Sequence, residues 1–503
     1  MSHELPARSQ ARCALFLAGA AAFWPPVYGQ QAAGASVSVV PSLSVQQTFT
    51  DNVALSTDNR RSESITQISP GISIAGRSGR VQGSLDYSLN ALFYARESDR
   101  NTLQNALNGV VRAELIDNHA FIDARATISQ QTISAFGTQS GNSGLINDNR
   151  SEVATLSVSP SLRGNLGGVV DVAATAGWSA SHSDSTDAGD TTSLSALLSL
   201  GGRQGLFGWG LNATRQVSGY ASEQDVTQDS VIASLSFSPD TELRLTLRGG
   251  REAIDVQGGT RQSSDTWGWG VDWIPTERTQ LSLQSDRRYF GSSHTFTARH
   301  RMARSIWSYS DTRGVSGEPG LAGADVLRAQ FNQLYTNCLS SLRDPALCNQ
   351  LVRQILGLDP TVSLGFLNSA RSLQRGQNLS VALSGLRTTV TLSAFRAATS
   401  RLDGVVYGEG DLSQVDQVRQ LGYSVAVSYR LTPVSSLAFV GARQKTLGAG
   451  SQPGNDQRSA TLSWSSSLGP RMTTSLALRH TLFESDSNPY NESAIIGSLS
   501  LRF

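Results

Sequence analysis

The sequence predicts an all-β protein: a large transmembrane antiparallel β-barrel of about 22 strands with one small helical insert. Apolar residues alternate with small or polar ones along segments of about 10–15 residues, longer than the five or six residues usual in globular strands. Short and long polar connections alternate between the segments, and the chain ends on such a segment at an aromatic residue, Phe503. This pattern is typical of outer-membrane barrels, whose strands cross the bilayer at a tilt.

Composition supports strands and turns. The 503 residues include 47 glycines, and serine and threonine recur throughout. Charged residues make up only 16% and the formal net charge is +1, so no strong field for nucleic acid exists and no nucleic-acid partner is expected.

Residues 1–30 are predicted to be a secretory signal peptide. Arg8 and Arg12 precede an apolar stretch from Ala14 to Trp24, and small residues follow near Gly29. The stretch is too short for a membrane helix, and no later segment approaches eighteen apolar residues. We therefore expect residues 36–503 to form a barrel in the outer membrane of a Gram-negative bacterium.

The alternation is clearest in three places. Leu243, Leu245 and Leu247 alternate with Arg244, Thr246 and Arg248. Tryptophans alternate with glycines from Trp267 to Trp273, and the last strand places one set of residues on a single face: Ile495, Gly497, Leu499, Leu501 and Phe503. Two environments, one on each face of a strand, produce this period. A terminal aromatic on such a strand resembles the signal that the outer-membrane assembly machinery reads, so Phe503 is assigned that partner.

Residues 318–376 break the alternation. One helical stripe contains Leu327, Phe331, Leu334, Cys338 and Leu342. Asp344 and Pro345 can start a second helix, whose stripe contains Cys348, Leu351 and Ile355. Cys338 and Cys348 are the cysteines that remain after signal cleavage, and an oxidising compartment predicts a disulfide between them. The insert follows an upward strand, which leaves two alternatives: an extracellular loop or a plug in the lumen.

Several segments resemble the PEP-CTERM-system-associated outer-membrane protein family of porin-like barrels. They are Pro41 to Val53, Ile68 to Ile72, Gly83 to Leu89 and Phe93 to Arg96, and the cysteine-bearing insert is also similar. The resemblance spans nearly the whole mature chain. It implies an association with exosortase-type sorting and exopolysaccharide production, and it carries no activity and no catalytic residues.

The search for reaction chemistry predicts no catalytic residue, no metal site and no cofactor, so we do not expect an enzyme. The six histidines show no metal-ligand spacing, although His294 and His300 lie in one neighbourhood. His480 has the parity of the lipid-facing Leu478 and Leu482, which favours an interfacial residue over a catalytic one. An outer-membrane enzyme is the weakest of the hypotheses.

The alternation along each strand also predicts which residues face the lumen. If the aliphatic and aromatic residues face lipid, a set of arginines faces inward: Arg244, Arg248, Arg288, Arg299 and Arg301. A basic wall would favour anionic solutes such as acidic polysaccharide. The alternative is that these arginines pair with lumen acids and simply fill a polar interior. Trp267, Trp269 and Trp273 share the lipid-facing parity, so an aromatic girdle is favoured over sugar stacking.

The leading hypothesis is a channel or export component linked to exopolysaccharide or another surface polymer. The alternative is a non-transporting surface anchor that uses the helical insert for interaction. The expected partners are outer-membrane lipid, the assembly machinery and polysaccharide.

Overall fold

A computed structural model gives the arrangement of the chain. It describes residues 36–185, 190–220, 225–256, 261–316, 321–322, 330–336, 338–339, 348–349, 352–353, 362–368, 371–402 and 410–503. The predicted signal peptide, residues 1–30, lies outside the described residues, as do Asp344 and Pro345. No helix among the described residues has the length and apolar character needed to span a membrane.

Strands dominate the described chain. The first half of the wall contains β1 (Ser36–Thr50), β2 (Glu63–Arg77), β3 (Val81–Tyr94), β4 (Thr102–Ile116), β5 (Ala120–Thr132), β6 (Arg150–Leu166), β7 (Val170–Ser183), β8 (Thr191–Gln204), β9 (Phe207–Tyr220), β10 (Val226–Phe237) and β11 (Leu243–Val256). The second half contains β12 (Gln262–Thr276), β13 (Thr279–Arg288), β14 (Gly291–Arg301), β15 (Ser305–Val315), β18 (Leu373–Ser384), β19 (Thr388–Ser400), β20 (Gln417–Thr432), β21 (Ser435–Leu447), β22 (Asn455–Gly469), β23 (Met472–Ser485) and β24 (Tyr490–Arg502).

Among the described residues, short elements outside the wall include η1 (Ser98–Arg100), β16 (Leu321–Ala322), β17 (Val362–Leu367) and α4 (Asp411–Gln414), and residues 330–336 are helical.

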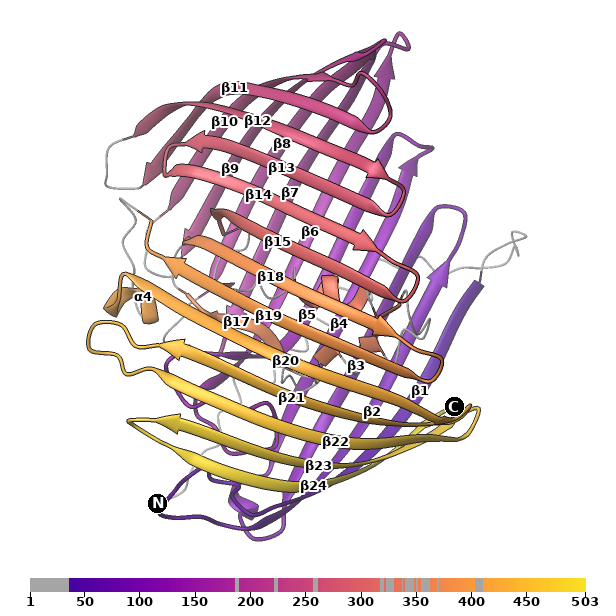
Figure 1. Cartoon of the computed structure of the whole chain (residues 1–503), viewed down its shortest axis with the longest axis vertical. Coiled ribbons are helices and arrows are strands. Elements are labelled where there is room, and N and C mark those ends of the chain that lie inside the picture. The colour runs from indigo at the N-terminus through magenta and orange to yellow at the C-terminus, as the bar shows by residue number, and fades with distance from the viewer. Residues whose placement is uncertain are drawn as a thin grey trace.

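The wall is one closed antiparallel barrel of 22 strands, which confirms the predicted fold class (Figure 1). It closes where β1 pairs with β24, with Ser42 opposite Arg502 and Thr50 opposite Ala494. β15 pairs directly with β18 over its whole length, so the insert interrupts the chain without interrupting the wall. Closure gives every wall strand a neighbour on each side, which is the condition for placing strands in lipid.

The alternation of side chains has the physical cause that the sequence suggested. On β20 the odd-numbered residues face outward, and Tyr423 is 53% exposed on that face. The even-numbered Ser424 and Ala426 are buried, because other parts of the chain cover the inner face. The outward residues supply an apolar surface to the membrane, and the inward residues meet the contents of the lumen.

Two boundaries differ from the sequence-based expectation. Pro275 and Thr276, where a proline in the sequence favours a turn, lie inside β12, and the register with β13 shifts between Trp273 and Thr276. Proline cannot donate to a ladder, so it is accommodated at this irregularity and the turn follows it. The wall resumes at Leu373, so the last residues assigned to the insert, up to 376, belong to β18.

The connections at the two ends of the barrel differ in length. Short turns join β2 to β3, β4 to β5 and the later pairs in the same sense, while the other end carries long connections such as residues 133–149 and 401–416. In bacterial barrels the short turns face the periplasm. The long-loop end therefore corresponds to the cell exterior.

The long loops fold over the mouth of the barrel. One cluster joins Val53 and Leu55 of the first loop to Leu145 of the loop 133–149 and to Phe483 and Tyr490 of the wall. These side chains are at least nine-tenths buried, so the loops have apolar contacts of their own.

A second cluster closes the mouth beside β9 to β11. It contains Tyr220, Val226, Ile254 and Leu402, with Tyr289 packed against it. Burial raises the pKa of the Tyr289 hydroxyl above its ordinary value, so this group stays neutral in its apolar surroundings.

Candidate functional site

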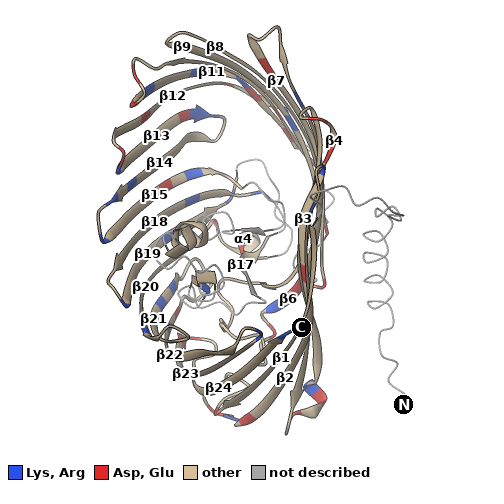
Figure 2. Ribbon diagram, turned by 90° about the vertical axis from the view of Figure 1, so that its right-hand side faces the viewer, with Lys and Arg blue, Asp and Glu red and all other residues tan. Residues whose placement is uncertain are grey.

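The described helical residues of the insert lie inside the barrel, against the inner wall (Figure 2). Its described residues Leu334, Cys338, Cys348 and Val352 are all at least nine-tenths buried and form one apolar cluster. The wall contributes Ala426 from β20 together with Ala438 and Val440 from β21. All three wall residues have inward parity, and Ala438 lies close to the short-turn end of β21, so this cluster places part of the insert within the lumen.

A disulfide joins Cys338 to Cys348, as the sequence predicts, with Cα atoms 5.6 Å apart. Phe331 and Tyr335 stack beside it with ring centroids 6.0 Å apart. The bond closes a short loop between two helical stretches whose own apolar core is small. Such a crosslink restricts the unfolded states of the hairpin and favours one compact shape.

The insert is also joined to the wall by backbone pairing. β17 runs parallel to the end of β5, with Val362 opposite Gln130 and Phe366 opposite Thr132. β5 can accept β17 because β4 and β5 pair only as far as Leu107 and Ile128 toward the long-loop end. The two wall strands therefore separate above that point, and the free edge of β5 receives the insert.

Glu152 of β6 accepts hydrogen bonds from groups that have no ladder partner where β4 and β5 separate. The backbone N–H of Asn105 donates to its carboxylate at 3.0 Å, and the Asn105 side-chain amide donates at 3.1 Å. Gln130 donates to the same carboxylate at 3.2 Å. A carboxylate thus replaces the carbonyl that a continuous ladder would have supplied to Asn105.

Polar contacts bind the loops to one another across the mouth. Asp411 of α4 accepts hydrogen bonds from the Ser134 hydroxyl at 2.6 Å and from the backbone N–H of Ala135 at 2.7 Å. The Asn455 amide donates to the carbonyl of Ala135 at 3.0 Å. Three loops that are far apart in sequence therefore meet at one point above the lumen.

A single arginine at the end of the insert reaches another part of the wall. Arg371 is 7% exposed and donates to the Gln228 side chain of β10 at 2.9 Å and to the carbonyl of Ser316 at 3.2 Å. β10 and β18 are separated by five strands of the wall, so this contact lies across the interior rather than along the sheet.

The structure places the predicted lumen arginines on the inward side of the wall. Two of them are paired with acids: Arg248 with Asp286 at 2.9 Å, and Arg288 with Glu252 at 2.5 Å. The Glu252 side chain is fully buried. These pairs line a recess of about 250 Å³ between β9 and β13. For these two arginines, the arrangement corresponds to the alternative in which lumen charges neutralise one another.

The other three predicted arginines form no ion pair among the described residues. Arg244 lies opposite Asp272 in the register but donates only to the Ser238 hydroxyl, at 3.4 Å. Arg299 and Arg301 lie at the short-turn end of β14, and Arg299 is opposite the uncharged Gln280. The lumen therefore carries unneutralised positive charge near its short-turn end.

The sequence did not indicate a further buried pair on the inner wall. Glu492 is 1% exposed, accepts from Arg479 at 2.8 Å and accepts from the Thr50 hydroxyl at 2.9 Å. It joins β24 to β23 and to β1, where the barrel closes. Its only sequence signal was an acidic residue at inward parity on a mostly apolar strand.

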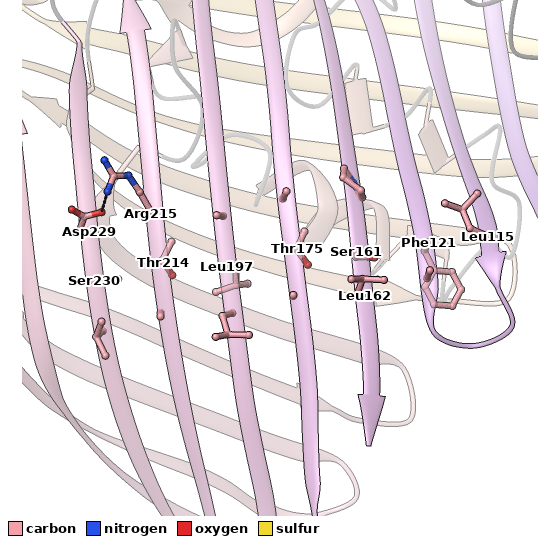
Figure 3. Close-up of a pocket in the computed structure, with 18 residues that line it drawn as sticks. Leu115, Phe121, Ser161, Leu162, Thr175, Leu197, Thr214, Arg215, Asp229 and Ser230 are labelled. Atoms are coloured by element: carbon pink, nitrogen blue, oxygen red, sulfur yellow. Dashed lines mark ion pairs between the residues drawn. The ribbon is translucent and has the colours of Figure 1, made fainter. Parts of the chain in front are cut away.

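A recess of about 860 Å³ lies over β4 to β10 on the outward face of the wall (Figure 3). Its lining includes the small outward residues Ala174, Ala196 and Ala213, and the Arg215–Asp229 ion pair lies at one edge. Because these side chains have the parity of the lipid-facing residues, the recess is part of the membrane-contacting surface and not a solute site.

The histidines do not come together. His294 bonds to Asp311 at 3.1 Å near one end of β14, whereas His300 bonds to Thr279 at 2.8 Å near the other. His480 faces outward and bonds to the Ser493 hydroxyl at 2.9 Å. Within the described ranges, no three His, Cys, Asp or Glu side chains form a group that could hold a metal ion.

The aromatic residues take outward positions. Trp267 is 58% exposed, Trp269 39% and Trp273 46%, all on the lipid-facing side of β12. This placement suits a wall or girdle role and keeps the three indoles out of the lumen.

Comparison with solved structures supports the architecture. The FrpB iron transporter from Neisseria meningitidis is 11% identical, with a TM-score of 0.50 over 92% of this chain and 82% of that one. A mutant of the ferric enterobactin receptor PfeA from Pseudomonas aeruginosa, in complex with enterobactin, is 10% identical, with a TM-score of 0.50 over 93% and 82%. Identities this low show the fold alone.

No family model matches the chain, and no curated protein matches it. The closed wall and its structural neighbours nevertheless define the class: this is an outer-membrane β-barrel protein of the Gram-negative type.

Proposed function

We propose that this chain forms a gated outer-membrane conduit for anionic solutes, kept closed by its own insert and loops. The observation that carries the proposal is the cluster of Leu334, Cys338 and Val352 on the inner faces of β20 and β21. An element held inside a barrel by side-chain packing and one short stretch of strand pairing can leave the wall without breaking it.

Positive charge supports the choice of an anionic solute. Arg299 and Arg301 face the lumen near the short-turn end, and neither pairs with a carboxylate among the described residues. An uncompensated guanidinium beside a water-filled path attracts anions and repels cations. The resemblance of the N-terminal strands to the PEP-CTERM-associated family favours an acidic exopolysaccharide among such solutes.

The surface-anchor alternative needs the insert to be accessible from outside the cell. The described helical residues of the insert pack against inward-facing wall residues instead, and this placement is why we favour the conduit.

Planar-bilayer recordings test the proposal. Replacement of residues 318–370 by a short Gly-Ser linker should convert a closed or rarely open barrel into one with steady conductance. In that background, R299E/R301E should lower the permeability of chloride relative to potassium. The matched control is R387E, which changes an exposed arginine in the turn between β18 and β19.

Absence of conductance after removal of the insert would overturn the conduit. Conductance with unchanged selectivity in R299E/R301E would leave a conduit but refute its anionic preference.

A further inference from the structure

Three cations surround one apolar residue on the lipid-facing side of β19 to β21. The central residue is Leu421 of β20. In the register of the sheet, Arg396 of β19 lies opposite Leu421 on one side and Lys445 of β21 lies opposite it on the other. Arg419 lies two residues further along β20 toward the long-loop end, on the same face. All four residues therefore point outward from the barrel.

The three cations lack acidic partners. Among the described residues, Arg396, Arg419 and Lys445 make no ion pair, and both arginines are exposed. The nearest acid in the register is Asp456, opposite Lys445. Its carboxylate is occupied by Arg443, with Nε to Oδ1 at 2.9 Å, and by a second arginine of β22 at 3.5 Å.

The position of the three cations along the barrel axis shows which part of the membrane surrounds them. The outward residues of β20 below it are Tyr423, Val425 and Tyr429, each between 38% and 53% exposed, so they form the apolar band. The cations lie at the limit of that band nearest the long-loop end. Arginine and lysine at this level meet the headgroups of the lipids around the barrel.

We propose that Arg396, Arg419 and Lys445 bind the phosphates of a lipid headgroup in the leaflet around the long-loop end. Arg396 and Lys445 are two strand spacings apart, roughly 10 Å. That separation suits a headgroup with two phosphates better than one with a single phosphate. Tyr423 and Leu421 lie in the middle of the site, where the acyl chains of a lipid would cover both. An acidic protein that bound through the three cations would offer these two residues no apolar partner.

This site is independent of the proposed conduit, because it lies on the opposite face of the wall from the lumen. It is tested on the full-length mature protein in detergent, by native mass spectrometry with bisphosphorylated lipid A, monophosphoryl lipid A and phosphatidylcholine. Wild-type protein should retain bisphosphorylated lipid A best. R396Q/R419Q/K445Q should bind it on the order of 100-fold more weakly, from roughly fivefold per cation.

Two variants serve as controls. R304Q/R387Q/R471Q removes three exposed arginines, which make no ion pair among the described residues, from turns at the short-turn end of the barrel, the opposite end from the cluster. It should bind bisphosphorylated lipid A as the wild type does. R396K/R419K keeps the charge and should retain the preference, which shows that a loss in the glutamine variant is not a failure to fold.

Equal binding by the wild type and R396Q/R419Q/K445Q would overturn the proposal, as would an equal loss in both glutamine variants. A wild-type protein that does not distinguish bisphosphorylated lipid A from phosphatidylcholine would also overturn it. Binding of soluble polyglutamate in place of lipid would assign the cluster to an acidic protein partner and reject the lipid site.

Discussion

Substitution of Leu334 by alanine should release the insert from the inner wall. Leu334 is 1% exposed and lies at the centre of the cluster with Ala426, Ala438 and Val440. A buried leucine replaced by alanine usually costs about 2–5 kcal/mol, because apolar contacts are lost and a cavity remains. If about 2–3 kcal/mol of that loss weakens the docking of the insert on the wall, the population of molecules with an undocked insert rises roughly 30- to 150-fold.

Cysteine labelling measures that population. Ala438 is 7% exposed beneath the insert, so the cysteine of A438C should react with a water-soluble maleimide only when the insert leaves the wall. Cys338 and Cys348 are joined in the disulfide and do not compete, and the experiment uses the mature chain without the predicted signal peptide that contains Cys13. Under conditions where the insert re-docks faster than it is labelled, the rate is proportional to the undocked fraction, so L334A should raise it by the same factor.

Two controls separate undocking from general loosening of the barrel. L92A removes a leucine that is equally buried, at 1% exposure, in the cluster beneath the long loops, and it should leave the labelling of A438C nearly unchanged. S199C, on the inner face of β8, should react quickly with or without L334A. An unchanged labelling rate of A438C in the L334A background would refute the docking argument.

Three further predictions concern the barrel wall, its assembly and the disulfide of the insert. E492Q should lower the free energy of unfolding in urea by about 3 kcal/mol, because it leaves Arg479 buried without its charge partner; an effect under about 1 kcal/mol, typical of an exposed pair, would contradict that. Deletion of Phe503 should reduce the amount of barrel assembled in cells, measured by membrane fractionation, and leave the conductance of inserted molecules unaltered. C338S/C348S should raise the labelling rate of the reporter cysteine on β21 with little effect on the midpoint of barrel unfolding, because the disulfide constrains only the insert.

The wall was predictable because its information is local. Period-two alternation fixes which residues face lipid, and a turn appears wherever the alternation stops, as at residues 302–304 between β14 and β15. The contacts that close the mouth were not predictable in the same way. The hydrogen bonds from Ser134 and Ala135 to Asp411 join residues nearly 280 positions apart, and neither partner differs from an ordinary loop residue in sequence.

The lumen arginines were predictable from the sequence in part. Inward parity could be inferred for Arg248 and Arg288, because each alternates with outward residues on its own strand. Their pairing with Asp286 and Glu252 depends on the register between strands and on side-chain direction, which a single sequence does not specify. Arg299 and Arg301 had the same sequence appearance but form no ion pair with any described residue, so parity alone could not separate neutralised charge from unpaired charge.

The docking surface of the insert did have a signal in the sequence, at one place in the wall where the alternation of apolar and polar residues fails. Residues 437–440 of β21 are apolar on both faces: Leu437 and Phe439 face outward, and Ala438 and Val440 face inward. An inward apolar pair is unfavourable beside a water-filled lumen, since its burial free energy would be lost. Such a pair is stable only when something apolar covers it, and the unpartnered helical stripe of Leu334 and Cys338 is the matching surface. On β21, the consecutive inward apolar residues therefore mark the surface against which the insert packs.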